Sequence, residues 1–140
     1  MSSLMVAAIG QAVAADAGLS PADRAFVAKA ARGGLMEVAA GNLAAKRALD
    51  PAVKAFGQKM VTDHTAANEK LKSLADSRQM PLPDAVSPEE NAALAKLEAL
   101  VGTDFDKTYS QMMVKDHVED ISEFEKEVKQ GQDVDVKSFA

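Results

Sequence analysis

The feature that most limits what this chain can fold into is a helix-start signal that occurs three times. Each copy joins a capping residue to a proline: Ser20-Pro21, Asp50-Pro51 and Ser87-Pro88. Serine and aspartate side chains accept hydrogen bonds from the free N–H groups of a helix's first turn, and proline suits the first helical position because its missing N–H needs no partner there. In the third copy, Glu90 completes a capping box. The three signals predict a series of consecutive helices.

The segments between these signals carry apolar residues at steps of three and four, which is the helical period. In the last long segment these steps give a stripe that is expected to face into the bundle: Phe105, Tyr109, Met113, His117, Ile121, Phe124 and Val128. Residues 80–84 contain two prolines and are predicted to be a connection, while Gly102 and Gly131 mark two further helix boundaries. The acidic residues of 119–127 are most simply a solvated helix face. The predicted helices span residues 21–49, 51–79, 88–101 and 104–130, and a further helix begins near Asp133.

Composition supports a single all-α domain and narrows its partners. Hydrophobic residues make up 47% of the 140 residues but aromatic residues only 4%, so small and aliphatic side chains supply the core. The net charge is −5 without a basic stripe, which argues against nucleic acid as a partner. The absence of cysteine excludes disulfides and thiolate metal sites. No apolar run is long enough to span a membrane.

The N-terminal segment resembles the end of a secretory signal peptide. An apolar run at residues 4–10 precedes Ala12-Val13-Ala14, which has the A-x-A pattern of a cleavage site. No basic residues precede the run, so the alternatives are a true start further upstream or an ordinary alanine-rich helix. We expect residues 1–15 to be a signal-peptide remnant and residues 20–140 to form the folded domain. The protein is then expected to be periplasmic or secreted.

Two of the predicted helices resemble one another in sequence. Residues 56–64 read FGQKMVTDH and residues 109–117 read YSQMMVKDH, so both contain Gln-x-Met-Val-x-Asp-His. Duplication of a helical hairpin explains this more simply than chance. The repeat predicts an up-down bundle of two hairpins in which His64 and His117 hold equivalent positions.

The two histidines are the residues best suited to chemistry. Each lies in the apolar stripe of its helix and follows an aspartate, and one has a second aspartate three residues later on the same face. Inward imidazoles on facing helices of a bundle are good ligands for Fe, Mn or Zn. The first helix can add a glutamate, which shares a face with several Gly and Ala residues that leave room for a close helix or a ligand. The candidate metal ligands are His64, His117, Asp63, Asp116, Glu37 and Asp120.

The two histidines can also serve a structural or an acid–base role instead of binding a metal. A partly buried histidine that is hydrogen-bonded to a carboxylate or backbone group is the more common situation in bundles, and acid–base catalysis is a third option. No Glu-x-x-His motif occurs, so the template of di-iron carboxylate bundles is not met and ferroxidase chemistry is not supported. We assign no catalytic residue, and a non-catalytic protein is expected before an enzyme.

Several motifs together resemble one known family. They include Gly33-Gly34-x-Met36-Glu37, Asp50-Pro51-x-Val53-Lys54-x-Phe56, Met60-Val61-x-Asp63-His64 and Met113-Val114-Lys115-Asp116-His117. This combination resembles domain-of-unknown-function family 4142 from about Ala25 to the C-terminus. The resemblance implies an exported bacterial protein with a ferritin-like bundle, and it supplies no activity.

Members of that family usually continue past the segment matching residues 135–140 into a long last helix with another histidine. The final helix is therefore expected to be truncated here, which would leave an apolar groove open. We expect Val136 and Phe139 to lie against the bundle, and the groove to be buried in a homo-oligomer.

The sequence thus predicts a periplasmic or envelope ferritin-like bundle of unestablished activity, with metal binding through inward His and Asp residues. One alternative is a non-catalytic structural or interaction module with an envelope protein as its partner. The other is a metal-dependent redox protein of the stress response.

Overall fold

The computed structural model describes residues 18–140, and these form five helices without a strand. The all-α prediction is therefore confirmed, whereas the predicted signal-peptide remnant at residues 1–15 lies outside the described residues. No helix in the described part is long and apolar enough to cross a membrane. The helices are α1 (Pro21–Arg47), α2 (Pro51–Ser77), α3 (Pro88–Glu98), α4 (Gly102–Gln130) and α5 (Val134–Phe139).

The three predicted capping residues all make their hydrogen bonds. The Asp23 N–H donates to Ser20 Oγ at 3.1 Å, and the Ala52 N–H donates to the Asp50 carboxylate at 2.7 Å. At α3 the capping box is complete, because Ser87 and Glu90 each accept from the other's backbone N–H. The starts of α1, α2 and α3 are therefore predictable from local chemistry alone.

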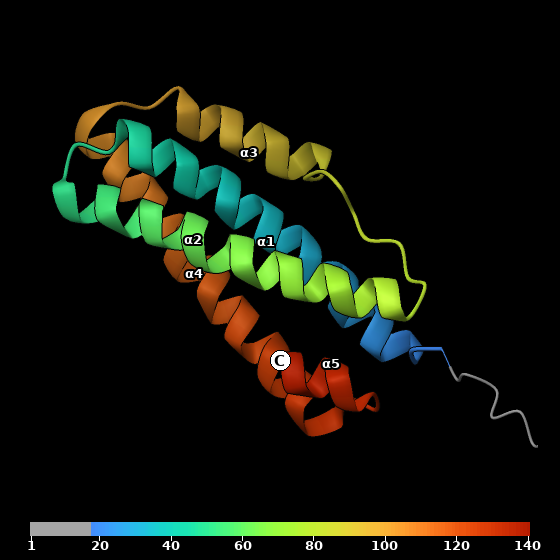
Figure 1. The fold of residues 1–140 in the computed structure, drawn as a ribbon. Coiled ribbons are helices and arrows are strands. Elements are labelled where there is room, and N and C mark those ends of the chain that lie inside the picture. The colour runs from blue at the N-terminus through green and yellow to red at the C-terminus, as the bar shows by residue number, and fades with distance from the viewer. Residues whose placement is uncertain (1–17) are drawn as a thin grey trace, which may run out of the picture.

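The first two helices form a tightly packed antiparallel hairpin, and α3 and α4 continue the up-down course of the chain (Figure 1). The hairpin depends on two glycines. A Cβ atom at Gly57 would lie 2.6 Å from Ala44 Cβ, and one at Gly41 would lie 2.8 Å from the Gly57 carbonyl oxygen. The small residues of α1 thus admit a neighbouring helix, as the sequence suggests.

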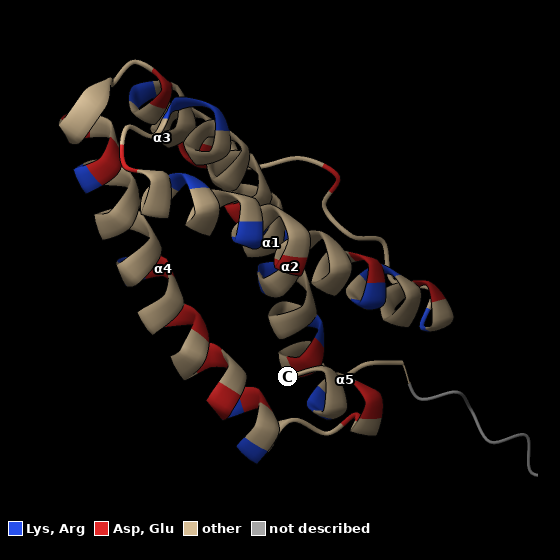
Figure 2. Cartoon of the chain, turned by 60° about the vertical axis from the view of Figure 1, so that its left-hand side comes forward, with Lys and Arg blue, Asp and Glu red and all other residues tan. Residues whose placement is uncertain are grey.

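The start of α4 is tied to the turn between α1 and α2. The Asp106 carboxylate accepts the backbone N–H groups of Leu49 and Asp50 at 2.9 and 2.7 Å. This contact fixes one end of α4 against the first hairpin. From there α4 diverges from α2, and α5 lies between the far ends of the helices (Figure 2). The far half of α4 keeps contact with α1, because the ring centroids of Phe124 and Phe26 are 5.0 Å apart.

Because α4 diverges, its predicted apolar stripe is buried only in its first half. Phe105, Tyr109 and Met113 are buried, whereas Ile121 and Val128 are 59% and 47% exposed. The burial expected for the last two residues is therefore wrong, because they line an open groove between α2, α4 and α5 instead. By contrast, Val136 is fully buried and Phe139 partly buried, so α5 does lie against the bundle as predicted.

The core consists of two separate apolar clusters. One lies at the α5 end and contains Phe26, Val27, Leu71 and Val136 among its buried residues. The other lies at the α3 end; its buried residues are Ala40, Ala44, Ala48, Met60, Leu97, Phe105, Tyr109 and Met113. Each long helix contributes to both ends, and the level between the clusters is left for polar side chains.

Candidate metal centre

Three polar side chains occupy the level between the two apolar clusters. Glu37 comes from α1, His64 from α2 and His117 from α4, and each lies between residues that belong to one cluster or the other. Glu37 is only 2% exposed, while both histidines are partly buried. The helical repeat explains the position of the histidines, because equivalent residues of α2 and α4 face the same level of α1. We call this group the polar belt.

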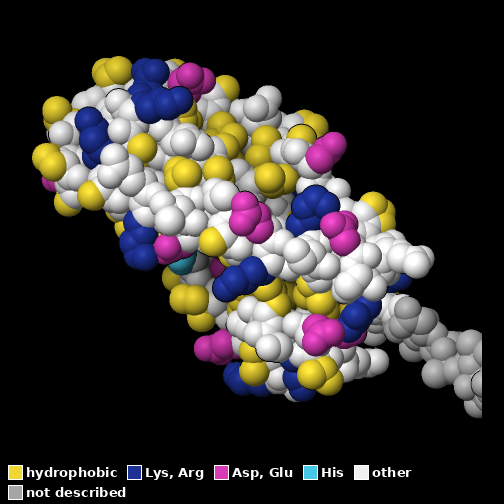
Figure 3. Space-filling view, in the orientation of Figure 1, with side chains coloured by type: hydrophobic (Ala, Val, Ile, Leu, Met, Phe, Trp, Pro, Cys, Tyr) yellow, Lys and Arg dark blue, Asp and Glu magenta, His cyan; other side chains and the backbone are white. Residues whose placement is uncertain are grey.

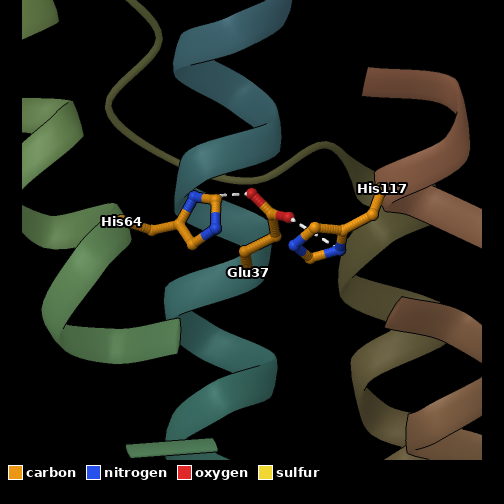
Figure 4. A group of neighbouring side chains, drawn as sticks. All are labelled: Glu37, His64 and His117. Carbon is orange, nitrogen blue, oxygen red and sulfur yellow. Dashed lines mark ion pairs between the residues drawn. The ribbon is translucent and has the colours of Figure 1, made fainter. Parts of the chain in front are cut away.

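In the polar belt, the two imidazole rings approach Glu37 from opposite sides (Figure 4). His64 Nδ1 lies 2.7 Å from Glu37 Oε2, and His117 Nδ1 lies 3.6 Å from Glu37 Oε1. The ring centroids are 6.0 Å apart and the rings are nearly perpendicular, at 87°. One donor atom from each residue lies within 4.8 Å of the other two. Small side-chain rotations would bring such atoms to the spacing that ligands of one ion require.

The hydrogen bonds of the rings indicate which nitrogen is free. His117 Nδ1 lies 2.8 Å from the Met113 carbonyl oxygen, which can only accept, so Nδ1 carries a proton. In a neutral His64 ring, the bond to the Glu37 carboxylate likewise places the proton on Nδ1. Each neutral ring then has an unprotonated Nε2, and in Figure 4 these atoms point inward from both sides.

Negative charge gathers around the polar belt and shifts the pKa values of several groups. The hydrogen bond to Glu37 raises the pKa of His64. Burial, followed by the charge of Glu37, raises the pKa of both Asp116 and Asp120. Burial and the same charge raise the pKa of Tyr109 to about 12. A cation bound at this level would offset the repulsion among these carboxylates.

Two grooves reach the polar belt from the surface. One, of about 930 Å³, runs between α2, α4 and α5 and is lined by Glu37, both histidines and a set of apolar residues. The other, of about 910 Å³, lies on the α3 side and is also lined by Glu37. A histidine side chain is visible at the surface in a hollow of the molecule (Figure 3). The belt is therefore accessible to a small ion.

The structure places the six predicted ligands unequally. Glu37, His64 and His117 come together, and Asp120 lines both grooves beside them. Asp63 also lines the larger groove, but it is exposed and forms an ion pair with Lys59, four residues earlier. Asp116 is half-buried and lines only the groove on the α3 side.

The sequence pattern does not predict two polar neighbours of the polar belt. The Tyr109 hydroxyl is buried without a hydrogen-bond partner, although the spacing predicts this residue only as part of an apolar stripe. The Asn68 side chain packs over Gly34, where a Cβ atom would lie 1.9 Å from its Oδ1, and Asn68 lines the larger groove. The position of Asn68 on the His64 face, one turn further along α2, is the only signal that could indicate it.

The fold and the belt together define a class: an all-α bundle with a buried carboxylate between two histidines. A family model matches residues 8–140, and the chain belongs to that family, Domain of unknown function (DUF4142). The comparison with curated proteins and the comparison with solved structures each found no match.

Proposed function

We propose that this protein binds a divalent transition-metal ion at the polar belt. The observation that carries the proposal is the Glu37 carboxylate, which is 2% exposed and has one oxygen, Oε1, without a hydrogen-bond partner among residues 18–140. A buried carboxylate needs a compensating charge or hydrogen bonds on both oxygens. His64 satisfies only Oε2. An ion bound between the carboxylate and the two rings would satisfy the rest.

The donor set favours Fe, Mn or Zn over Mg or Ca. It contains two imidazole nitrogens and one carboxylate, whereas Mg and Ca prefer oxygen ligands alone. His64 and His117 would bind through Nε2, because Nδ1 of each ring is already hydrogen-bonded. Asp120 lies where it can supply a further oxygen, and the remaining positions would face the grooves. We assign no catalytic reaction to this site.

A purely structural belt is the second candidate, and one observation favours it. The 2.7 Å bond between His64 and Glu37 is a good ion pair when the ring is protonated, and the raised pKa of His64 makes that form more populated. The belt would then join the two apolar clusters without any ion. A belt without a metal would fit the alternative function, in which the protein is a non-catalytic structural or interaction module of the envelope.

We also propose that the protein functions in the periplasm or envelope, on the basis of the A-x-A pattern at residues 12–14. One preparation tests both proposals: untagged protein is recovered from the native envelope fraction without chelators. We expect about one ion of Fe, Mn or Zn per chain by elemental analysis, and an N-terminus near Ala14 or Ala15 by intact mass. A metal-free protein that does not take up these ions would favour the structural belt. A mass that includes Met1 would contradict export.

We further propose that the chain associates with itself through α4. Four exposed aliphatic residues lie along one face of this helix at steps of three, four and seven: Val114, Val118, Ile121 and Val128. We expect sedimentation at micromolar concentration to give a dimer or larger species. Val118→Lys, which places a charge in the middle of this face, should shift the protein towards the monomer. A wild-type monomer at these concentrations would contradict the proposal.

A further inference from the structure

A buried pair of acidic residues lies outside the polar belt, where the turn between α4 and α5 meets the start of α1. Its members are Asp23, which is 1% exposed, and Glu127, which is 5% exposed. Both Asp23 oxygens accept backbone N–H groups of the turn, from Gln132 at 3.0 Å and from Asp133 at 3.1 Å. Asp23 thus fixes the turn that leads into α5.

Glu127 adds a second carboxyl group to this contact. Its carboxyl group is a close neighbour of that of Asp23, and its Oε1 is buried without a hydrogen-bond partner among residues 18–140. Two carboxyl groups buried side by side favour the form in which one carries a proton, because two carboxylates repel each other and offer no donor. Gly131 makes room for Glu127, since a Cβ atom at this position would lie 2.2 Å from Glu127 Oε1.

A proton suits this pair better than a metal ion. Both Asp23 oxygens are already engaged by backbone N–H groups, so few oxygens are left, whereas Ca²⁺ requires six to eight. The hydrogen bonds favour Glu127 as the residue that holds the proton, because two backbone N–H groups stabilise the charged form of Asp23 whereas Glu127 Oε1 has no donor among residues 18–140. In agreement, burial and then the neighbouring Asp23 carboxyl group raise the pKa of Glu127 to about 7, while the pKa of Asp23 is lowered.

We propose that Asp23 and Glu127 form a proton-operated latch, which holds α5 against the bundle when Glu127 is protonated and releases it when Glu127 ionises. Ionisation places two negative charges side by side in a buried site. The latch then opposes, rather than supports, the docking of the α4–α5 turn.

The remaining charged groups near Glu127 do not remove this effect. Lys137 of α5 lowers the pKa of Glu127 and Asp133 raises it, but Asp133 is itself paired with Arg78 of α2 at 3.1 Å. Around the hollow beside Glu127, the Lys29 ammonium group is paired with Glu123 at 3.3 Å. The charged groups that face Glu127 are Asp23 and Lys29 of α1, Glu123 and Lys126 of α4, and Asp133 and Lys137 at α5.

The position of α5 gives the latch a consequence for the larger groove. Ser138, Phe139 and Ala140 line the groove that leads to the polar belt. Phe139 also packs against Phe26 and Phe124, with ring centroids 6.5 and 6.1 Å apart. Release of α5 would widen this end of the groove. The latch itself requires no metal, and only its effect on access to the belt rests on the proposed function.

Amide hydrogen exchange of the whole chain tests the latch without any metal. The opening of α5 should increase between the ordinary pKa of a glutamate, 4.5, and the raised value of about 7, and should level off above that. After correction for intrinsic exchange, we expect protection of the amides of residues 136–140 to fall more than roughly tenfold over this interval. Protection within α1 and α2 should change little.

Glu127→Gln and Glu125→Gln form a matched pair for this test. Glutamine at 127 is uncharged at every pH, so protection of α5 should become independent of pH. Glu125 is exposed on the same helix and is paired only with Lys129, so its variant should keep the wild-type pH dependence. A ¹³C titration that follows the carboxyl chemical shift of Glu127 measures its protonation state directly. Unchanged α5 protection in the wild type, or the same pH dependence in Glu127→Gln, would overturn the latch.

Discussion

Replacing His117 by alanine is expected to weaken binding of zinc, manganese or iron by roughly 100-fold or more, because one of three protein ligands is lost. Glu37→Gln should have a similar effect, since it removes the negative charge and preserves the shape. Affinity is measured by competition with a chromogenic chelator on untagged protein. Asp63→Asn is the matched control, because Asp63 lines the same groove but is exposed and paired with Lys59, and its loss should change affinity less than about threefold.

The same site should release its metal on acidification. The folded-state pKa of His64 is raised, so the ring takes up a proton at a higher pH than an ordinary histidine and competes with the ion. Affinity is therefore expected to be greatest above this pKa, and to fall by up to about tenfold per pH unit below it. If His117→Ala and Asp63→Asn bound metal alike, the structural belt would be the better account.

The second large effect concerns the contact between α1 and α2. Gly57→Val should destabilise the fold by about 3 kcal/mol, because its Cβ atom alone would lie 2.6 Å from Ala44 Cβ and 2.9 Å from a backbone nitrogen. Gly57→Ala should cost less, roughly 1 to 2 kcal/mol, because better helix propensity offsets part of the clash. Urea unfolding followed by circular dichroism measures both free energies.

Gly33 provides the control for helix propensity. It also lies inside a long helix, but a Cβ atom at this position would meet nothing within 4 Å. Gly33→Ala should therefore stabilise the protein by roughly 0.5 to 1 kcal/mol. If both alanine variants were stabilising, the close approach of α1 and α2 would not limit the fold.

Much of the polar belt is predictable because it depends on helical periodicity. The repeat relates His64 to His117, and the shared face of α1 adds Glu37, so three of the six predicted ligands come together. Local spacing cannot indicate how far two helices diverge, however. Ile121 and Val128 continue the stripe of α4, and they are exposed because the helix is anchored at its start by Asp106 and diverges from α2 afterwards.

The acidic pair at α5 escapes prediction for a related reason. The acidic face of α4 that contains Glu127 is predicted to be solvated, yet Glu127 is buried because the turn after α4 folds back onto it. Asp23 is more than 100 residues away in sequence from the amides that it accepts. Gly131 does end the helix as predicted, but its φ of −59° is open to any residue, and the need for glycine comes from the packing of Glu127.

The separation of the core into two apolar clusters has a consequence for how the molecule responds to its surroundings. The buried residues of the two ends form separate apolar sets, so the ends are joined by the long helices that run through both and by the side chains between them. The polar belt is the level at which the two ends meet, through one carboxylate and two rings carried by three different helices. Whatever occupies that level adds to the coupling between the ends. A bound ion would join α4 more firmly to α1 and α2 there, and its loss would weaken that link.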